Sequence, residues 1–226
     1  MAGIEEQLNN QKMLYREIFV KSENEIKKRF EELRPDKISD DLLTKFAPDS
    51  DGENWQKQCL ELLNGELSKE VYDKMLEILA YRKMFKCSGC ATCCNLACSE
   101  YSYEELKQKA QNGDNFAAQF TSVFVPYENI NEARAIYPEY VDLVTEKTGG
   151  KIYFYHCPKL TAEKRCSDYE NRPQICRDFP DNPLDILPEK CGFCAWKEEI
   201  NPVALMLHSL IAIIEFYKQK LTEVMS

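Results

Sequence analysis

Cysteine thiols are the groups in this sequence whose number and spacing point most clearly to chemistry. The chain holds eleven, and five of them fall in the segment CSGCATCCNLAC, residues 87–98. Crowded thiols pair as disulfides, exchange electrons or bind a metal ion. Ten are candidate metal ligands: Cys87, Cys90, Cys93, Cys94, Cys98, Cys157, Cys166, Cys176, Cys191 and Cys194.

The spacing of these cysteines predicts how they are presented. Cys87-x2-Cys90 and Cys191-x2-Cys194 predict tight turns that aim two thiolates at one ion, and Cys93 repeats the step after Cys90. Adjacent residues point in different directions, so we expect the Cys93–Cys94 pair to serve two metals, or one of the two to serve structure. Ten thiols can complete two four-thiolate sites, or fill one and leave several free. Zinc and iron–sulfur clusters both accept such ligands, and the spacing does not separate them.

Composition and charge narrow the function classes. The chain of 226 residues carries a net charge of −9, which argues against a nucleic-acid-binding protein. Its first residues lack the basic and apolar regions of a secretion signal, and we expect a cytoplasmic protein. The longest nearly apolar run, Val203–Ile214, is about half of the roughly 20 residues that span a bilayer, so we expect no membrane contact. In a reducing cytosol, clustered thiols are metal ligands more often than disulfides.

Hydrophobic periodicity predicts a mostly α-helical protein with minimal β-structure. Helices are expected over residues 4–33, 53–64 (stopping at Gly65), 68–85, 103–112, 115–124 and 138–147, followed by a strand over 151–156 that delivers Cys157. We expect Ser68 to cap the third of these helices, a capping box of Ser102 and Glu105 to open the fourth, and Pro138 to occupy the first turn of the last. In helix 68–85 we expect Val71, Met75, Leu76, Ile78, Leu79 and Met84 on the buried side. We predict an amino-terminal helical region (1–83), a cysteine-rich metal-binding domain (84–195) and a carboxy-terminal helix (196–226). The helices would form a bundle that encloses the irregular cysteine-rich segment.

The last helix is predicted to begin at Pro202, after an Asn201 cap. Its apolar residues recur at intervals of three and four, which is typical of a helix at the centre of a bundle or shared with a second subunit. The amino-terminal helix is its expected neighbour, and a homodimer or another protein partner is the alternative.

Residues near the thiols complete the candidate site. Arg172 and Arg177 favour thiolates and are candidate donors to sulfur. His156 on the predicted strand should face away from Cys157, and His208 is expected to be a buried, hydrogen-bonded side chain. Cys59 lies in an apolar helical segment, where a small buried residue is the expected role.

Three segments resemble one known family: CSGCATCC (87–94), CPKL (157–160) and CSDYENRPQICRDFP (166–180). These residues are similar to the CxxCxxCC cysteine-cluster proteins, whose shared domain is described as zinc- or iron-chelating. The resemblance covers roughly residues 84–195. One branch of that family includes flagellin lysine N-methylases, and this implies a link to S-adenosylmethionine and an iron–sulfur cluster.

Two functions therefore compete. The first is a metal-binding module in which zinc or an iron–sulfur cluster is structural or is bound cargo. The second is an iron–sulfur enzyme related to protein lysine N-methylases. The glycines form no phosphate-binding loop and there is no G-x-S-x-G nucleophile motif, so no substrate-binding motif accompanies the thiols. We favour the first function and assign no catalytic residue.

Overall fold

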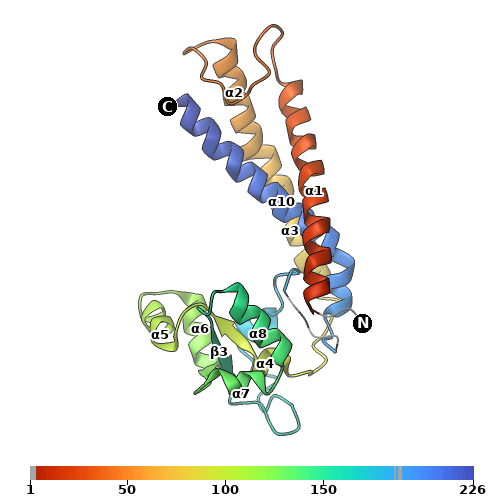
Figure 1. The fold of residues 1–226 in the computed structure, drawn as a ribbon, viewed down its shortest axis with the longest axis vertical. Helices are drawn as coiled ribbons and strands as arrows, with labels where there is room; N and C mark the ends of the chain where they lie inside the picture. The colour runs from red at the N-terminus through yellow and green to blue at the C-terminus, as the bar shows by residue number, and fades with distance from the viewer. Residues whose placement is uncertain (1–3, 186, 188–189) are drawn as a thin grey trace. The chain divides into compact units, whose positions relative to one another are not determined.

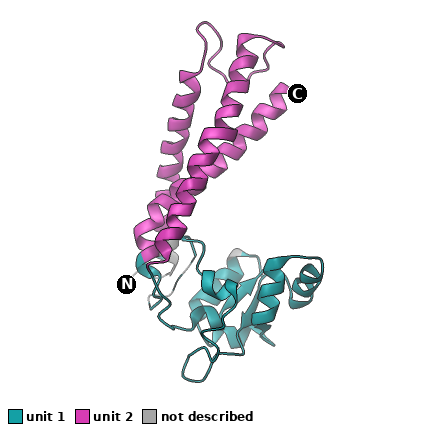
Figure 2. Ribbon diagram, turned by 180° about the vertical axis from the view of Figure 1, so that it is seen from behind, with its two compact units in different colours: residues 1–7, 85–195 teal, residues 8–84, 196–226 magenta. Residues whose placement is uncertain are grey.

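The computed structural model describes residues 4–185, 187 and 190–226 (Figure 1). The prediction of a mostly α-helical protein with minimal β-structure is confirmed. The chain divides into two compact units (Figure 2). We call residues 85–195, with the residues up to Gln7, the thiol unit, and residues 8–84 with 196–226 the helical unit. The predicted bounds of three domains stay predictions.

The helical unit is built from long helices. They are α1 (Ile4–Glu32), α2 (Asp51–Leu62), the π-helical turn η1 (Leu63–Leu67), α3 (Ser68–Arg82) and α10 (Cys194–Met225). Within the unit, α10 packs against α1, as predicted: the rings of Phe30 and Tyr217 lie 5.1 Å apart. The Trp55 indole donates to the Phe30 carbonyl over 2.8 Å, which ties α2 to the end of α1. Buried aromatic and aliphatic side chains thus hold the unit together.

The expected stop at Gly65 is wrong. The chain continues through it in the π-helical turn, and α3 follows without a break. The Ser68 hydroxyl donates to the Leu63 carbonyl over 2.7 Å instead of capping a new helix. The expected buried face of α3 is confirmed for Val71 and Ile78, which are buried. It is wrong for the other four residues, because Met75, Leu76, Leu79 and Met84 are exposed.

The predicted start of the last helix is wrong by two turns. Helix α10 begins at Cys194, and Pro202 lies inside it. An internal proline removes one helical hydrogen bond and costs about 3 kcal/mol. The residues before it offset this cost, because Trp196 and Ile200 are buried in the helical unit. The Trp196 indole also donates to the Ile78 carbonyl over 3.3 Å, so tertiary packing extends the helix past the local stop signal.

Helix α10 is also the one described helix that is long and apolar enough to cross a membrane by length and composition. The apolar stretch that meets this criterion is longer than the uncharged run Val203–Ile214, because occasional charged residues are allowed in it. In the structure 44% of that window is buried within the protein. The absence of membrane contact therefore stays a prediction.

The thiol unit contains a three-stranded antiparallel sheet in the order β1-β3-β2. The strands are β1 (Ala97–Ser99), β2 (Val125–Pro126) and β3 (Tyr153–His156). Around them lie α4 (Thr92–Asn95), α5 (Tyr103–Gln111), α6 (Asn115–Val123), α7 (Ile130–Arg134), α8 (Pro138–Lys147) and α9 (Gln174–Asp178). The predicted capping box of Ser102 and Glu105 forms at α5, and Pro138 opens α8.

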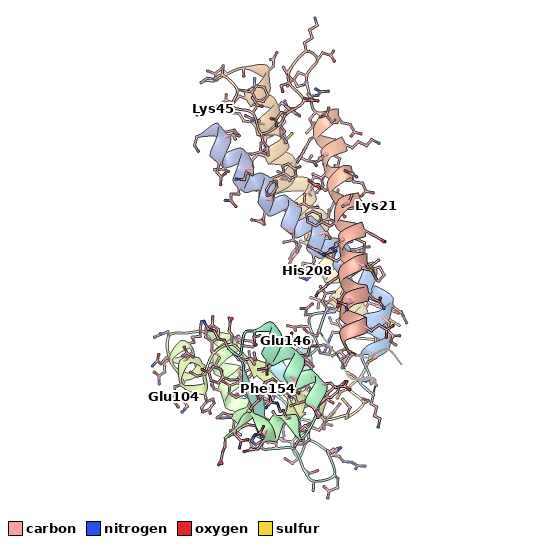
Figure 3. All side chains as sticks on the ribbon, viewed as in Figure 1. Lys21, Lys45, Glu104, Glu146, Phe154 and His208 are labelled. Atoms are coloured by element: carbon pink, nitrogen blue, oxygen red, sulfur yellow. The ribbon has the colours of Figure 1, made fainter. Side chains whose placement is uncertain are left out.

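Adjacent residues of β3 point to opposite faces of the sheet, and each contributes to a small core. Tyr155 packs with Leu106 and Phe120 of α5 and α6. Phe154, labelled in Figure 3, packs with Leu96 and other side chains from the opposite side of the sheet. The central strand is thereby fixed, and it delivers Cys157 at its end.

The buried thiol of Cys59 predicts a pH dependence of the helical unit. Its side chain is fully buried, as expected, and burial raises its pKa from 9.0 to about 12. The unfolded chain loses this proton above about pH 9 and the folded chain does not, so stability present below pH 9 is lost as the pH rises toward 12. Between pH 8 and pH 10 we expect a loss of about 1.4 kcal/mol in wild type that Cys59→Ala lacks. Urea unfolding of both proteins checks this, and identical pH dependences would contradict it.

Candidate metal centre

Two Cys-x2-Cys segments of the thiol unit each place a backbone N–H beside the leading sulfur. Residues 191–194 form a turn closed by Cys194 N–H to the Cys191 carbonyl at 3.1 Å, whereas residues 87–90 form a loop without turn structure. In Cys87-x2-Cys90, the backbone N–H of Gly89 donates to the Cys87 Sγ atom over 3.4 Å. In Cys191-x2-Cys194, the backbone N–H of Phe193 donates to the thiol of Cys191, again two residues earlier. Backbone N–H groups aimed at the first sulfur are what the predicted tight turns provide for thiolates.

These two Cys-x2-Cys segments lie directly against each other. A Cβ atom added to Gly192 would sit 2.0 Å from the Lys86 carbonyl oxygen and 3.0 Å from the Ser88 nitrogen. The Ser88 hydroxyl also donates to the Lys190 carbonyl oxygen over 2.5 Å. Burial and the charges of Cys90, Cys194 and Cys87 together raise the pKa of Cys191 to about 11. The four thiols therefore lie within range of one another's charge.

A second group of thiols gathers at the end of β3. The Cys157 N–H donates to the Cys94 carbonyl over 2.7 Å. The chain then turns back as a hairpin, in which Thr161 N–H donates to the Arg165 carbonyl and Leu160 bridges to Cys166. Cys176, on α9, packs against the same core as Cys157.

The charges of this second group interact. Burial and the charges of Cys157, Cys94 and Cys166 together raise the pKa of Cys176 to about 11. Burial and the charges of Cys94 and Cys166 also raise the pKa of Cys157. The structure thus brings four thiols from three separate segments into one neighbourhood.

Cys93 and Cys94 occupy the junction of the two groups, on the single turn of α4. A hydrogen bond from Cys93 and the charge of Arg172 lower the pKa of Cys94 to about 7. The same hydrogen bond raises the pKa of Cys93, as do burial and the charges of Cys94, Cys87 and Cys90. Cys93 therefore faces the charges of the first group, and Cys94 those of the second.

The two predicted arginines differ in their roles. The Arg172 guanidinium stacks 3.6 Å from the Tyr169 ring and acts on Cys94 through its charge. Arg177 donates to the carbonyl oxygens of Arg172 and Glu170, so it secures the loop that leads to Cys176.

Three other predicted residues lie apart from these thiols. Cys98, on β1, has its Sγ atom 3.7 Å from the Tyr140 hydroxyl, and the structure does not bring it together with the two groups. His156 packs against the Tyr127 ring at 4.7 Å. The expected burial of His208 is wrong, because this residue is exposed on α10 (Figure 3).

Some residues that shape the site carried no usable sequence signal. Gln119 of α6 accepts a hydrogen bond from the Ile175 N–H over 3.0 Å and so fixes the start of α9 beside Cys176. Ser88 joins the two Cys-x2-Cys segments through its hydroxyl. Both are ordinary surface residue types, and their partners are distant in the sequence.

The donor set fits a thiophilic metal. All eleven cysteines lie in the described part of the chain and are free thiols. Among the described residues, no three Cys, His, Asp or Glu side chains already converge in an arrangement that holds a metal ion. The backbone contacts described above bring the segments that carry these thiols together. Zinc and iron are the common metals with a preference for such soft donors.

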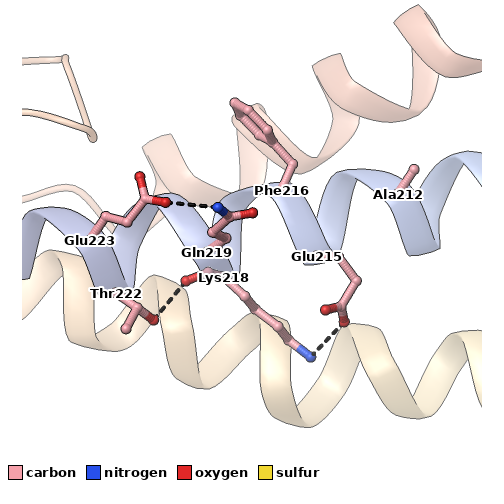
Figure 4. Close-up of a pocket in the computed structure, with 7 residues that line it drawn as sticks. All are labelled: Ala212, Glu215, Phe216, Lys218, Gln219, Thr222 and Glu223. Carbon is pink, nitrogen blue, oxygen red and sulfur yellow. Dashed lines mark hydrogen bonds and ion pairs between the residues drawn. The ribbon is translucent and has the colours of Figure 1, made fainter.

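A hollow on the surface of α10 is unrelated to the thiols (Figure 4). Its polar side chains pair along the helix: Gln219 donates to Glu223 over 2.8 Å, and Lys218 forms an ion pair with Glu215 at 3.6 Å. These pairs are typical of a solvated helix surface.

The contact at Gly192 gives a direct test of the first group. We expect Gly192→Ala to push the two Cys-x2-Cys segments apart, because the added methyl group meets backbone atoms that cannot rotate away. Metal content should fall while the helical unit keeps its circular dichroism. The matched control is Gly65→Ala, where the added Cβ atom would meet nothing within 4 Å. Equal metal content in both variants would contradict the close approach.

Comparison with known proteins gives one match. The model of the CxxCxxCC family, described as a "Putative zinc- or iron-chelating domain", matches residues 86–199, just over half of the chain. No curated protein and no solved structure matches the chain.

Proposed function

Because the chain belongs to the CxxCxxCC family, we propose that its thiol unit binds zinc or an iron–sulfur cluster as a structural or cargo group. The observation that carries the proposal is the gathering of thiols from residues 87–94, 157–176 and 191–194, with every cysteine free. A cytoplasmic, reducing location is part of the proposal, since it keeps these thiols available.

The chain's own residues have a defined part in this function. Backbone N–H groups of Gly89, Phe193 and Lys159 each donate to the thiol two residues earlier, so each of these sulfur atoms has a hydrogen-bond donor beside it. The charge of Arg172 lowers the pKa of Cys94. A bound metal would cross-link segments that, among the described residues between Cys157 and Cys191, have little regular secondary structure.

Coordination number supports a structural or cargo role over catalysis. A catalytic zinc keeps an open position for water or substrate, whereas a structural zinc is saturated by four protein ligands. Here the thiols are numerous enough to saturate the metal in each neighbourhood. The described hollow on α10 holds none of them.

Elemental analysis of protein purified without oxygen tests the proposal. We expect zinc or iron in at least a stoichiometric amount per chain. Iron with acid-labile sulfide and a brown colour would identify a cluster, and a colourless zinc protein the alternative. Protein that holds neither metal, and takes up neither after reduction and addition of Zn²⁺ or Fe²⁺ with sulfide, would contradict the proposal.

A further inference from the structure

We propose that the thiol unit holds two separate four-thiolate metal sites that meet at the Cys93–Cys94 pair. The first consists of Cys87, Cys90, Cys191 and Cys194, and the second of Cys94, Cys157, Cys166 and Cys176. This inference rests on the proposed metal binding and adds to it the number of sites and the ligands of each.

The first site is defined by two Cys-x2-Cys segments, a loop at residues 87–90 and a hydrogen-bonded turn at residues 191–194. Each has the two-residue spacing, and in each a backbone N–H donates to the leading sulfur. Gly192 is required because only a residue without a Cβ atom fits against the Lys86 carbonyl. The bond from Ser88 to Lys190 closes the same contact from the other side. Two facing pairs of thiols are the tetrahedral donor set of a structural zinc site.

The second site has separate backbone support. The 2.7 Å hydrogen bond from Cys157 N–H to the Cys94 carbonyl fixes these two residues side by side. The antiparallel hairpin, closed by Ser167 N–H to the Lys159 carbonyl at 2.9 Å, returns the chain so that Cys166 rejoins Cys157. Contacts of α9 with α6 place Cys176 on the same core as Cys157.

Eight thiols cannot serve one four-coordinate ion, and the two sets of supporting contacts share no residue. The adjacent residues Cys93 and Cys94 mark the boundary. Cys94 has the bond to Cys157, so it belongs with the second set. Cys93 hydrogen-bonds Cys94 and lies between the sets as a positioning residue. Cys98 belongs to neither, because its thiol contacts Tyr140.

Counting and mapping the sites on the full chain tests the inference. The anaerobically purified protein is loaded with Zn²⁺, and native mass spectrometry should show two zinc ions per chain. A chelator then removes zinc in steps, and iodoacetamide with peptide mapping reports which thiols become free. We expect the thiols to become alkylated in two sets of four, divided as above. In Cys191→Ser we expect one zinc and continued protection of the second set. In Cys166→Ser we expect one zinc and protection of the first.

The control is Cys98→Ser, which should keep both zinc ions. One zinc per wild-type chain would overturn the two-site inference and leave the proposed function intact. No zinc or iron at all would overturn the proposed function as well. Alkylation that mixes the two sets in wild type would also overturn the division. Because this result is obtained on wild type, it decides the question even if a serine variant fails to fold.

Discussion

Replacing Cys176 with serine is expected to lower the metal content of the purified protein and to expose residues 157–190 to proteolysis. The hydroxyl is a poor substitute for a thiolate toward a thiophilic metal. We expect affinity at the affected site to fall by more than the roughly 10–100-fold typical of losing an outer-shell partner. The segment has one short helix, α9, among its described residues, and we expect it to depend on the bound metal for order.

Metal analysis and limited proteolysis measure both effects, with Cys98→Ser as the matched control in the same unit. Cys98 is also a partly buried cysteine, but its neighbour is a tyrosine hydroxyl. Cys90→Ser should lower metal content as Cys176→Ser does. Unchanged metal content and cleavage rates in both variants would contradict the ligand assignment.

The largest expected effect on stability is that of Trp196→Ala in the helical unit. Trp196 is 0% exposed, and its indole bonds the Ile78 carbonyl across to α3. Removing a fully buried tryptophan costs about 3–5 kcal/mol of unfolding free energy through lost burial and the cavity left behind. Urea unfolding followed by circular dichroism checks this value.

The control for Trp196 lies on the same helix. Phe216 is 49% exposed, so Phe216→Ala should change the unfolding free energy by no more than about 0.5 kcal/mol. Similar costs for the two substitutions would show that the amino-terminal part of α10 does not anchor the unit.

Local signals in the sequence predicted local structure well. The capping box at Ser102 and the proline at the start of α8 act within one turn, and both form as expected. Gly65 and Pro202 are equally strong local signals, but there the chain continues as a helix. In the second case the reason is tertiary, since burial of Trp196 and Ile200 outweighs the preference of a few residues.

The site was predictable in composition but not in arrangement. The two-residue spacing predicted the turn at Cys191, which forms, whereas residues 87–90 form a loop instead of the predicted turn. The spacings contained no information on which distant thiols meet, because that depends on the sheet register, the hairpin after Cys157 and the docking of α9. The prediction of the buried face of α3 was wrong in part for a related reason. Helical periodicity shows where apolar residues gather, and here a second apolar stripe is exposed.

X-ray absorption at the metal edge of the anaerobically purified full chain tests the central claim most directly. If thiolates from distant segments bind the metal, the first shell should consist of sulfur, with about four atoms at about 2.3 Å for zinc. An iron–sulfur cluster would likewise show sulfur as the nearest shell. A first shell of oxygen and nitrogen atoms would contradict the account.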